Sequence, residues 1–134
     1  MSLMQVQYQG SLRTHATHLD SKNTLITDAP KDNNGNGEAF SPTDLLCTSL
    51  ASCMLTIAAM KGRTMGIELQ GVMVTVQKKM QAAPRKVAEI VLTFDWQGLD
   101  RRISPEELQI LKEAALNCPV ALSLDSSVKK TLVW

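Results

Sequence analysis

The stretch that decides the fold runs from residue 41 to residue 60 and reads SPTDLLCTSLASCMLTIAAM. It opens with the clearest helix-start signal in the chain. Ser41 fits the N-cap, Pro42 fits the first helical position, and Asp44 fits the third position of a capping box. These residues therefore predict a helix that starts at Pro42.

The run Leu45–Met60 carries no charge over its 16 residues. It is shorter than the roughly 20 residues that a transmembrane helix needs, and it contains four Ser or Thr, so we expect a helix buried inside protein. The helix is predicted to continue to about Met65 with Gly66 as its stop, or to end one turn earlier at Gly62. A helix on one sheet needs only one apolar stripe, so a helix without charge on any side favours a partner helix in a dimer.

Strand patterns flank this helix on both sides. The expected strands are residues 4–9, 12–17, 23–27, 71–80, 86–96 and 129–134. The segment 28–39, rich in Asp, Asn and Gly, predicts a loop. Ser104-Pro105-Glu106-Glu107 repeats the helix-start signal and predicts a second helix to about Leu116, and Cys118-Pro119 predicts a short helix to about Leu124.

The order βββ-α-ββ-αα-β with short connections predicts an α+β fold, with antiparallel sheets around two main helices. The length of 134 residues and the absence of a linker-like segment predict one domain over residues 1–134. Met1-Ser2-Leu3, ahead of Met4, resembles a vector remnant and carries no part of this prediction.

Charge and cysteine content narrow the function classes. With 14 basic and 13 acidic residues the net charge is +1, so neither a nucleic acid nor a membrane is expected as a partner. Three cysteines, an odd number, are unlike a secreted disulfide framework, and no signal peptide is recognised, so a cytoplasmic location is predicted. His15 and His18 lack further ligands at metal-binding spacing, and no metal or other cofactor is expected.

The three cysteines have different settings. Cys53 lies in mid-helix, where it is either a small core residue or a reactive thiol that needs an outside cation or donor. Cys118 fits a helix N-cap, a position that lowers a thiol pKa, but it could equally serve only to cap the turn. Cys47 precedes Cys53 by six residues, about 9 Å of helical rise, so we expect a core role for it. Cys53 and Cys118 are 65 residues apart, and only tertiary folding can bring them together.

Several segments resemble the OsmC/Ohr family of osmotically inducible protein C and organic hydroperoxide resistance proteins, and more closely its OsmC-like branch. The matching segments are Phe40–Leu46, Leu50–Met54, Asn117–Val120, Ser123-Leu124, Thr27–Pro30 and Gly66–Leu69. The resemblance implies an intertwined homodimer and cysteine-based reduction of organic hydroperoxides. It implies that Cys53 attacks the peroxide, that Cys118 resolves the oxidised sulfur, and that an external dithiol, a lipoyl group in some members, regenerates the pair.

One departure from the family concerns the groups that activate the thiol. The Ohr branch has Glu directly after the motif proline, whereas this chain has Thr43 there and its acid at Asp44. The family's peroxidases also hold the thiolate with an N-terminal arginine, for which Arg13 is the nearest candidate. Asp44 and Cys53 are nine residues apart, about 13.5 Å along a straight helix and on opposite faces. An acid near Asp44 that orients an arginine at Cys53 must therefore come from a partner chain or across a break.

Two functions are consistent with the sequence. The first is a dithiol-dependent peroxidase, whose apolar residues favour alkyl or lipid hydroperoxides. Those residues are Phe40, Leu50, Met54 and Met60. The second is a non-catalytic dimer that binds a small hydrophobic ligand or acts as a redox-responsive protein. Loss of two free thiols on peroxide treatment distinguishes the first from the second.

Overall fold

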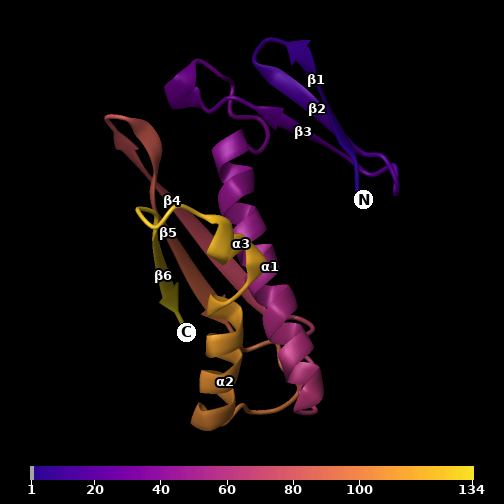
Figure 1. Ribbon diagram of the computed structural model, residues 1–134, viewed down its shortest axis with the longest axis vertical. Coiled ribbons are helices and arrows are strands. Elements are labelled where there is room, and N and C mark those ends of the chain that lie inside the picture. Colours follow the sequence, from indigo (N-terminus) through magenta and orange to yellow (C-terminus); the bar gives the residue numbers. More distant parts are fainter. Residues whose placement is uncertain (1) are drawn as a thin grey trace. The chain divides into compact units, whose positions relative to one another are not determined.

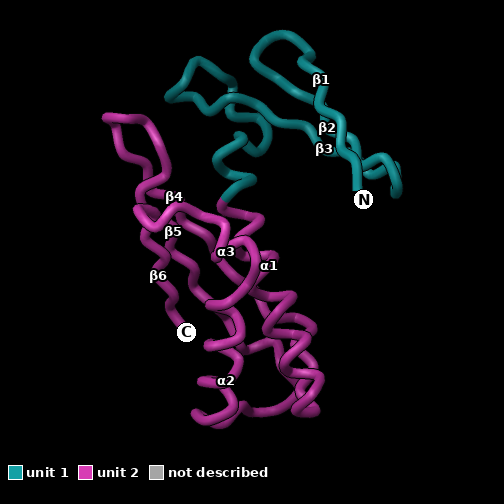
Figure 2. Tube along the Cα trace, in the orientation of Figure 1, with its two compact units in different colours: residues 1–46 teal, residues 47–134 magenta. Residues whose placement is uncertain are grey.

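The computed structural model describes residues 2–134, so Met1 of the predicted vector remnant lies outside the described residues. The chain divides into two compact units, residues 1–46 and residues 47–134 (Figure 2). The prediction of one domain stays a prediction, and each unit is described by itself below.

Unit 1 is built on a three-stranded antiparallel sheet in the order β1-β2-β3 (Figure 1). Its elements are β1 (Met4–Gly10), β2 (Arg13–His18), β3 (Thr24–Asp28) and the 3-10 turn η1 (Lys31–Asn33). All three strands were predicted to within one residue at each end, because period-2 alternation and turn residues mark them. The register places Arg13 opposite Asp28.

Helix α1 (Pro42–Thr64) starts and ends as the sequence predicts. At its start the Ser41 hydroxyl accepts a hydrogen bond from the Asp44 N–H at 3.1 Å, and the Asp44 carboxylate accepts one from the Ser41 N–H at 2.9 Å. This reciprocal pair is the predicted capping box.

The end of α1 is fixed by backbone hydrogen bonds around Gly66. The Ile67 N–H donates to the Gly62 carbonyl at 2.8 Å, and the Gly66 N–H donates to the Arg63 carbonyl at 3.3 Å. Gly66 has φ of 72°, the left-handed conformation that this Schellman arrangement requires. The helix therefore passes through Gly62 and does not stop there.

Unit 2 contains a mixed three-stranded sheet in the order β4-β5-β6. β4 (Met73–Ala82) and β5 (Arg85–Asp95) form the predicted antiparallel hairpin, whereas β6 (Lys129–Val133) pairs parallel to β5. The α+β class is confirmed, but the expectation of purely antiparallel sheets did not include this parallel pair. The two helices between β5 and β6 form a crossover, which returns the chain in the same direction.

Helices α2 (Pro105–Leu116) and α3 (Pro119–Ser123) supply the rest of the core of unit 2. Ser104 and Glu107 form a second complete capping box at the start of α2. The completely buried core side chains come from α1, β5, α2 and the start of α3. They are Leu50, Met54, Ala58, Ile90, Leu92, Leu111, Ala115 and Cys118. The three helices thus pack against β5, which is the central strand of the sheet.

Helix α1 buries only one stripe within this chain. Its buried residues are Cys47, Leu50, Ala51, Met54, Ala58 and Gly62. Met60 remains 59% exposed and Leu46 39% exposed. By length and composition alone α1 could also cross a membrane, a test that the core helix of a globular fold passes equally. The expectation that this helix is covered on all sides is thus not met by a single chain.

Candidate active site

The fold brings Cys53 and Cys118 together. α1 carries Cys53, which is half-buried, and Cys118 is the N-cap residue of α3 and has no exposed surface. The two side chains lie close enough together for Cys53 to raise the pKa of Cys118. The sequence could propose this pair only through the family resemblance, because 65 residues separate its members.

Cys118 has an environment that favours the protonated thiol. Burial raises the pKa of Cys118, and both the hydrogen bond with Cys53 and the charge of an ionised Cys53 raise it further. Backbone N–H groups of Ala121 and Val120 act in the opposite direction, and the Ala121 N–H donates to the Cys118 sulfur at 3.4 Å. The N-cap placement predicted from sequence is therefore present, but burial outweighs it, so the pKa of Cys118 rises rather than falls.

Cys47 and the residues predicted to line an apolar substrate site differ in their burial. Cys47 is 2% exposed and lies in the core, as the six-residue spacing predicts. Leu50 and Met54 are completely buried, whereas Met60 is 59% exposed. Leu50 and Met54 are therefore core residues, and Met60 lies at the surface.

Arg13 is held by two carboxylates of unit 1. Its Nη2 lies 2.5 Å from Glu38 Oε2 and 3.6 Å from Asp28 Oδ2. The hydrogen bond and charge of Glu38, followed by the charge of Asp28, raise the pKa of Arg13. Arg13 is thus a permanently charged guanidinium with a fixed set of anionic partners.

Asp28 is the buried member of this cluster. Its side chain is 1% exposed, and Oδ2 accepts a hydrogen bond from the Glu38 N–H at 2.9 Å. Oδ1 has no hydrogen-bond partner within the described residues 2–134. Sequence reasoning missed both Asp28 and Glu38 as partners of Arg13. The only signal for Asp28 was its position across the β2–β3 pair, and Glu38 follows a loop whose path no local pattern fixes.

Asp44 lies in the first turn of α1, where its carboxylate completes the capping box with Ser41. Asp44 and Arg13 both belong to unit 1, whereas Cys53 and Cys118 belong to unit 2. Among residues 2–134, no three His, Cys, Asp or Glu side chains gather closely enough to hold a metal ion.

Comparison with known families identifies the fold that carries this thiol pair. The family model for OsmC-like proteins matches residues 35–133. The chain belongs to the OsmC-like family. A search of curated proteins gives no match.

Solved structures agree with the OsmC-like assignment. A protein of Psychrobacter arcticus, provisionally described as an osmotic stress induced and detoxification response protein, is 47% identical with a TM-score of 0.93, over 99% of this chain and 95% of that one. An organic hydroperoxide resistance protein OsmC of Legionella pneumophila is 20% identical with a TM-score of 0.77, over 99% and 95% of the two chains. One from Elizabethkingia anophelis, with thiocyanate bound, is 16% identical with a TM-score of 0.72, over 99% and 94%. The last two show the shared OsmC-like fold.

Proposed function

We propose that this OsmC-like protein reduces organic hydroperoxides, with Cys53 as the attacking thiol and Cys118 as the resolving thiol. The observation that carries the proposal is the proximity of the two side chains, which is close enough for Cys53 to raise the pKa of Cys118. The names of the hydroperoxide resistance proteins that share the fold support the same reaction class.

The difference in exposure supports the division of roles. Cys53 is half-buried and can meet a substrate from outside, whereas Cys118 has no exposed surface and its raised pKa keeps it as a thiol. An attacking sulfur needs access and thiolate character, while a resolving sulfur needs only to reach its partner. The arrangement therefore fits Cys53 as attacker better than the reverse.

The chemistry balances with two co-reactants, an organic hydroperoxide and a dithiol. The Cys53 thiolate attacks the O–O bond, the hydroperoxide leaves as an alcohol, and Cys53 becomes a sulfenic acid. The Cys118 sulfur then attacks Cys53, water leaves, and a disulfide forms. An external dithiol, such as a lipoyl protein, reduces this disulfide and becomes a disulfide itself. Because the two side chains already lie close together, a disulfide between them joins neighbours within the folded chain.

The exposed surface of α1 supports the proposal of a homodimer. Leu45–Met60 has no charge, yet α1 buries a single stripe within its own chain. A second copy is the partner that such a helix favours, because burial of apolar surface drives association. Sedimentation at micromolar concentration is expected to give twice the 14.7 kDa of one chain. A monomer under those conditions would contradict the dimer. The cytoplasmic location belongs to the same proposal.

Thiol counting after peroxide treatment tests the reaction. One equivalent of cumene hydroperoxide is expected to remove two of the three free thiols of the reduced protein, and Cys47→Ser, the matched control, should still lose two. Cys53→Ser should lower turnover with a dithiol by at least about a thousandfold. Cys118→Ser should keep the first oxidation and accumulate a sulfenic acid that dimedone traps.

The alternative is a non-catalytic dimer. It predicts that all three thiols persist after peroxide treatment. Turnover that survives in Cys53→Ser would also refute the assignment.

Arg13 and Asp44 are proposed to assist Cys53, with Asp44 acting from a partner chain. Asp44→Ala is then expected to slow oxidation of Cys53 by about tenfold or more. Since Asp44 also caps α1, Ser41→Ala is the matched control, because it removes the same capping box at a cost of about 1 kcal/mol without removing a charge. Equal oxidation rates in the two variants would leave Asp44 with the capping role alone.

A further inference from the structure

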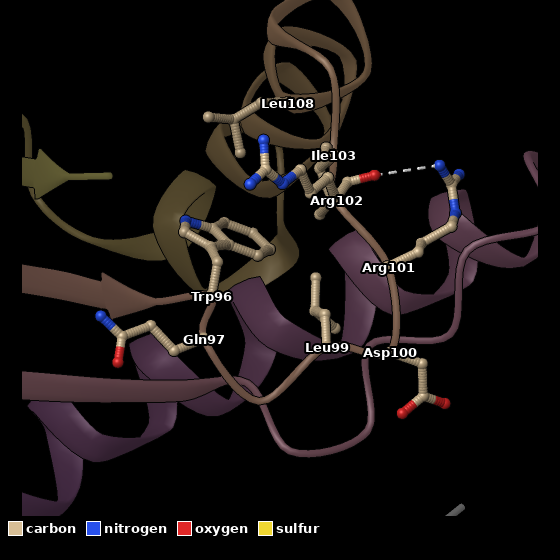
Figure 3. Close-up of a pocket in the computed structure, with 8 residues that line it drawn as sticks. All are labelled: Trp96, Gln97, Leu99, Asp100, Arg101, Arg102, Ile103 and Leu108. Atoms are coloured by element: carbon tan, nitrogen blue, oxygen red, sulfur yellow. Dashed lines mark hydrogen bonds between the residues drawn. The ribbon is translucent and has the colours of Figure 1, made fainter.

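A cavity of about 520 Å³ lies in unit 2, between the loop that follows β5 and the start of α2 (Figure 3). Its lining residues are Trp96, Gln97, Leu99, Asp100, Arg101, Arg102, Ile103 and Leu108. The volume falls within the range of about 300–1,000 Å³ that small-molecule sites occupy. The side chains include an aromatic wall, several aliphatic groups and two guanidinium groups.

The cavity is separate from the thiol pair. It adjoins the first turn of α2, whereas Cys118 follows the last turn of the same helix. α2 has 12 residues, which span about 18 Å. A ligand in the cavity therefore occupies a place other than that of the proposed peroxide.

The aromatic wall is held in place by stacking. Trp96 stacks on Trp134 with ring centroids 5.4 Å apart and an interplanar angle of 15°, and Trp134 stacks in turn on Phe94 at 4.1 Å. β5 carries Phe94 and ends next to Trp96, while Trp134 follows β6, so the sheet itself fixes the stack. Leu99, Ile103 and Leu108 add aliphatic groups to the lining. The cavity therefore offers the apolar part of a ligand a flat aromatic surface held in place by stacking.

The two arginines of the lining differ in their partners. Arg101 is neutralised, since its Nη1 and Nη2 donate to the two carboxylate oxygens of Glu107 at 3.2 and 2.8 Å. The guanidinium of Arg102 has no hydrogen-bond or ion-pair partner within residues 2–134. In Figure 3, Arg102 extends toward the side of Trp96 and Leu108, whereas Arg101 extends to the other side and the Asp100 carboxylate points away. One unpaired cation thus borders the apolar cavity.

We propose that this cavity is a binding site for a small apolar carboxylate, whose ring or alkyl body lies against Trp96 and whose carboxylate pairs with Arg102. Guanidinium and carboxylate form charge-assisted, commonly bidentate hydrogen bonds. The site is therefore expected to bind an anion more tightly than a neutral molecule of the same shape. The site requires no thiol chemistry and stands independently of the peroxidase proposal.

Tryptophan fluorescence tests the site, because the chain has only two tryptophans and both belong to the stack. Phenylbutyrate is the probe, and phenylbutanamide, its neutral counterpart, is the reference ligand. Titration of the full-length protein with phenylbutyrate is expected to change the emission saturably, with a dissociation constant below about 1 mM. The amide is expected to bind about tenfold more weakly, since it cannot form the ionic pair.

Arg102→Gln provides the decisive variant. It removes the charge at an exposed position, so the fold is expected to persist, and it should bind phenylbutyrate about tenfold more weakly and no better than the amide. Arg63→Gln, an exposed arginine outside the lining, is the matched control and should bind both ligands as the unmodified protein does. No change in emission at millimolar phenylbutyrate, equal affinity for acid and amide, or an Arg102→Gln variant that still prefers the acid would each overturn the proposal.

Discussion

The starts of α2 and α3 have the same N-cap geometry but lie in different surroundings. Ser104 and Cys118 are each followed by proline, and their backbone angles are nearly the same, with φ/ψ of −70°/158° and −69°/149°. Each side chain accepts a hydrogen bond from the N–H three residues later, at 3.1 Å for the Ser104 oxygen and 3.4 Å for the Cys118 sulfur. At α2, the Glu107 carboxylate also accepts a hydrogen bond from the Ser104 N–H at 3.0 Å.

The difference between the two caps lies in their surroundings. Ser104 and Glu107 are partly exposed, and Glu107 forms an ion pair with Arg101. Cys118, in contrast, is completely buried and lies near Cys53. Oxygen is the better acceptor, so a sulfur at the cap of α3 is a poorer choice for stability alone. The same cap geometry therefore occurs with an oxygen at a partly exposed helix start and with a sulfur at a buried one.

The largest expected effect concerns thiol reactivity. In the reduced native protein, iodoacetamide is expected to label Cys53 at least about tenfold faster than Cys118, because Cys118 has no exposed surface and burial raises its pKa. Peptide mass spectrometry over a time course measures both rates, and denatured protein provides the control in which all cysteines react alike. Equal labelling in the native state would remove the distinction between the buried thiol and its half-buried partner.

A stability change of moderate size tests the oxygen cap. Ser104→Ala leaves the Glu107 N–H without its acceptor and is expected to lower the free energy of unfolding by about 1 kcal/mol. Urea denaturation measures the change, and peroxide turnover should stay the same, because this cap lies at the end of α2 away from the thiols. A loss of turnover equal to that of Cys118→Ser would show that the two caps are not separable.

The smallest effect is a pH dependence at the same cap. The hydrogen bond from Arg101, followed by that from the Ser104 N–H, lowers the pKa of Glu107 from 4.5 to about 2. A carboxylate whose pKa is lower in the folded state contributes stability that is complete above the unfolded value and is lost as pH falls through the folded value. The difference in melting temperature between Glu107→Gln and the unmodified protein should therefore be constant above pH 4.5 and shrink toward pH 2. A difference that does not vary over this range would contradict the assigned pairing.

Helix ends were predicted well from the sequence wherever a capping residue, a proline or a glycine sets the local backbone conformation. The capping boxes at Ser41 and Ser104, and the stop at Gly66, place helix ends within a residue or two. The parallel pairing of β6 was missed, since strand direction depends on the path of the α2–α3 crossover and not on the pattern of β6 itself. The sequence did predict that α1 needs more cover than one small sheet provides, but which of its residues stay exposed depends on the neighbours that one chain supplies.

Some features of the candidate site could be predicted from the sequence, whereas others depend on tertiary packing. Cys53 and Cys118 could be named from the family motifs, but their proximity depends on the packing of α1 and α3 in one core. The partners of Arg13 could not be named, because Glu38 and Asp28 reach it through a loop and a strand register. The roles of Arg13 and Asp44 toward Cys53 stay predictions.

The sequence by itself determined where helices start and stop, the family, and which two cysteines to consider, because caps, prolines and glycines act within a few residues. Only the tertiary structure decided that Cys118 is buried with a raised pKa and lies near Cys53. It also decided that Arg102 borders the cavity with no side-chain partner among residues 2–134. Burial and contact are properties of neighbours far apart in the chain, and no local pattern specifies which of them meet.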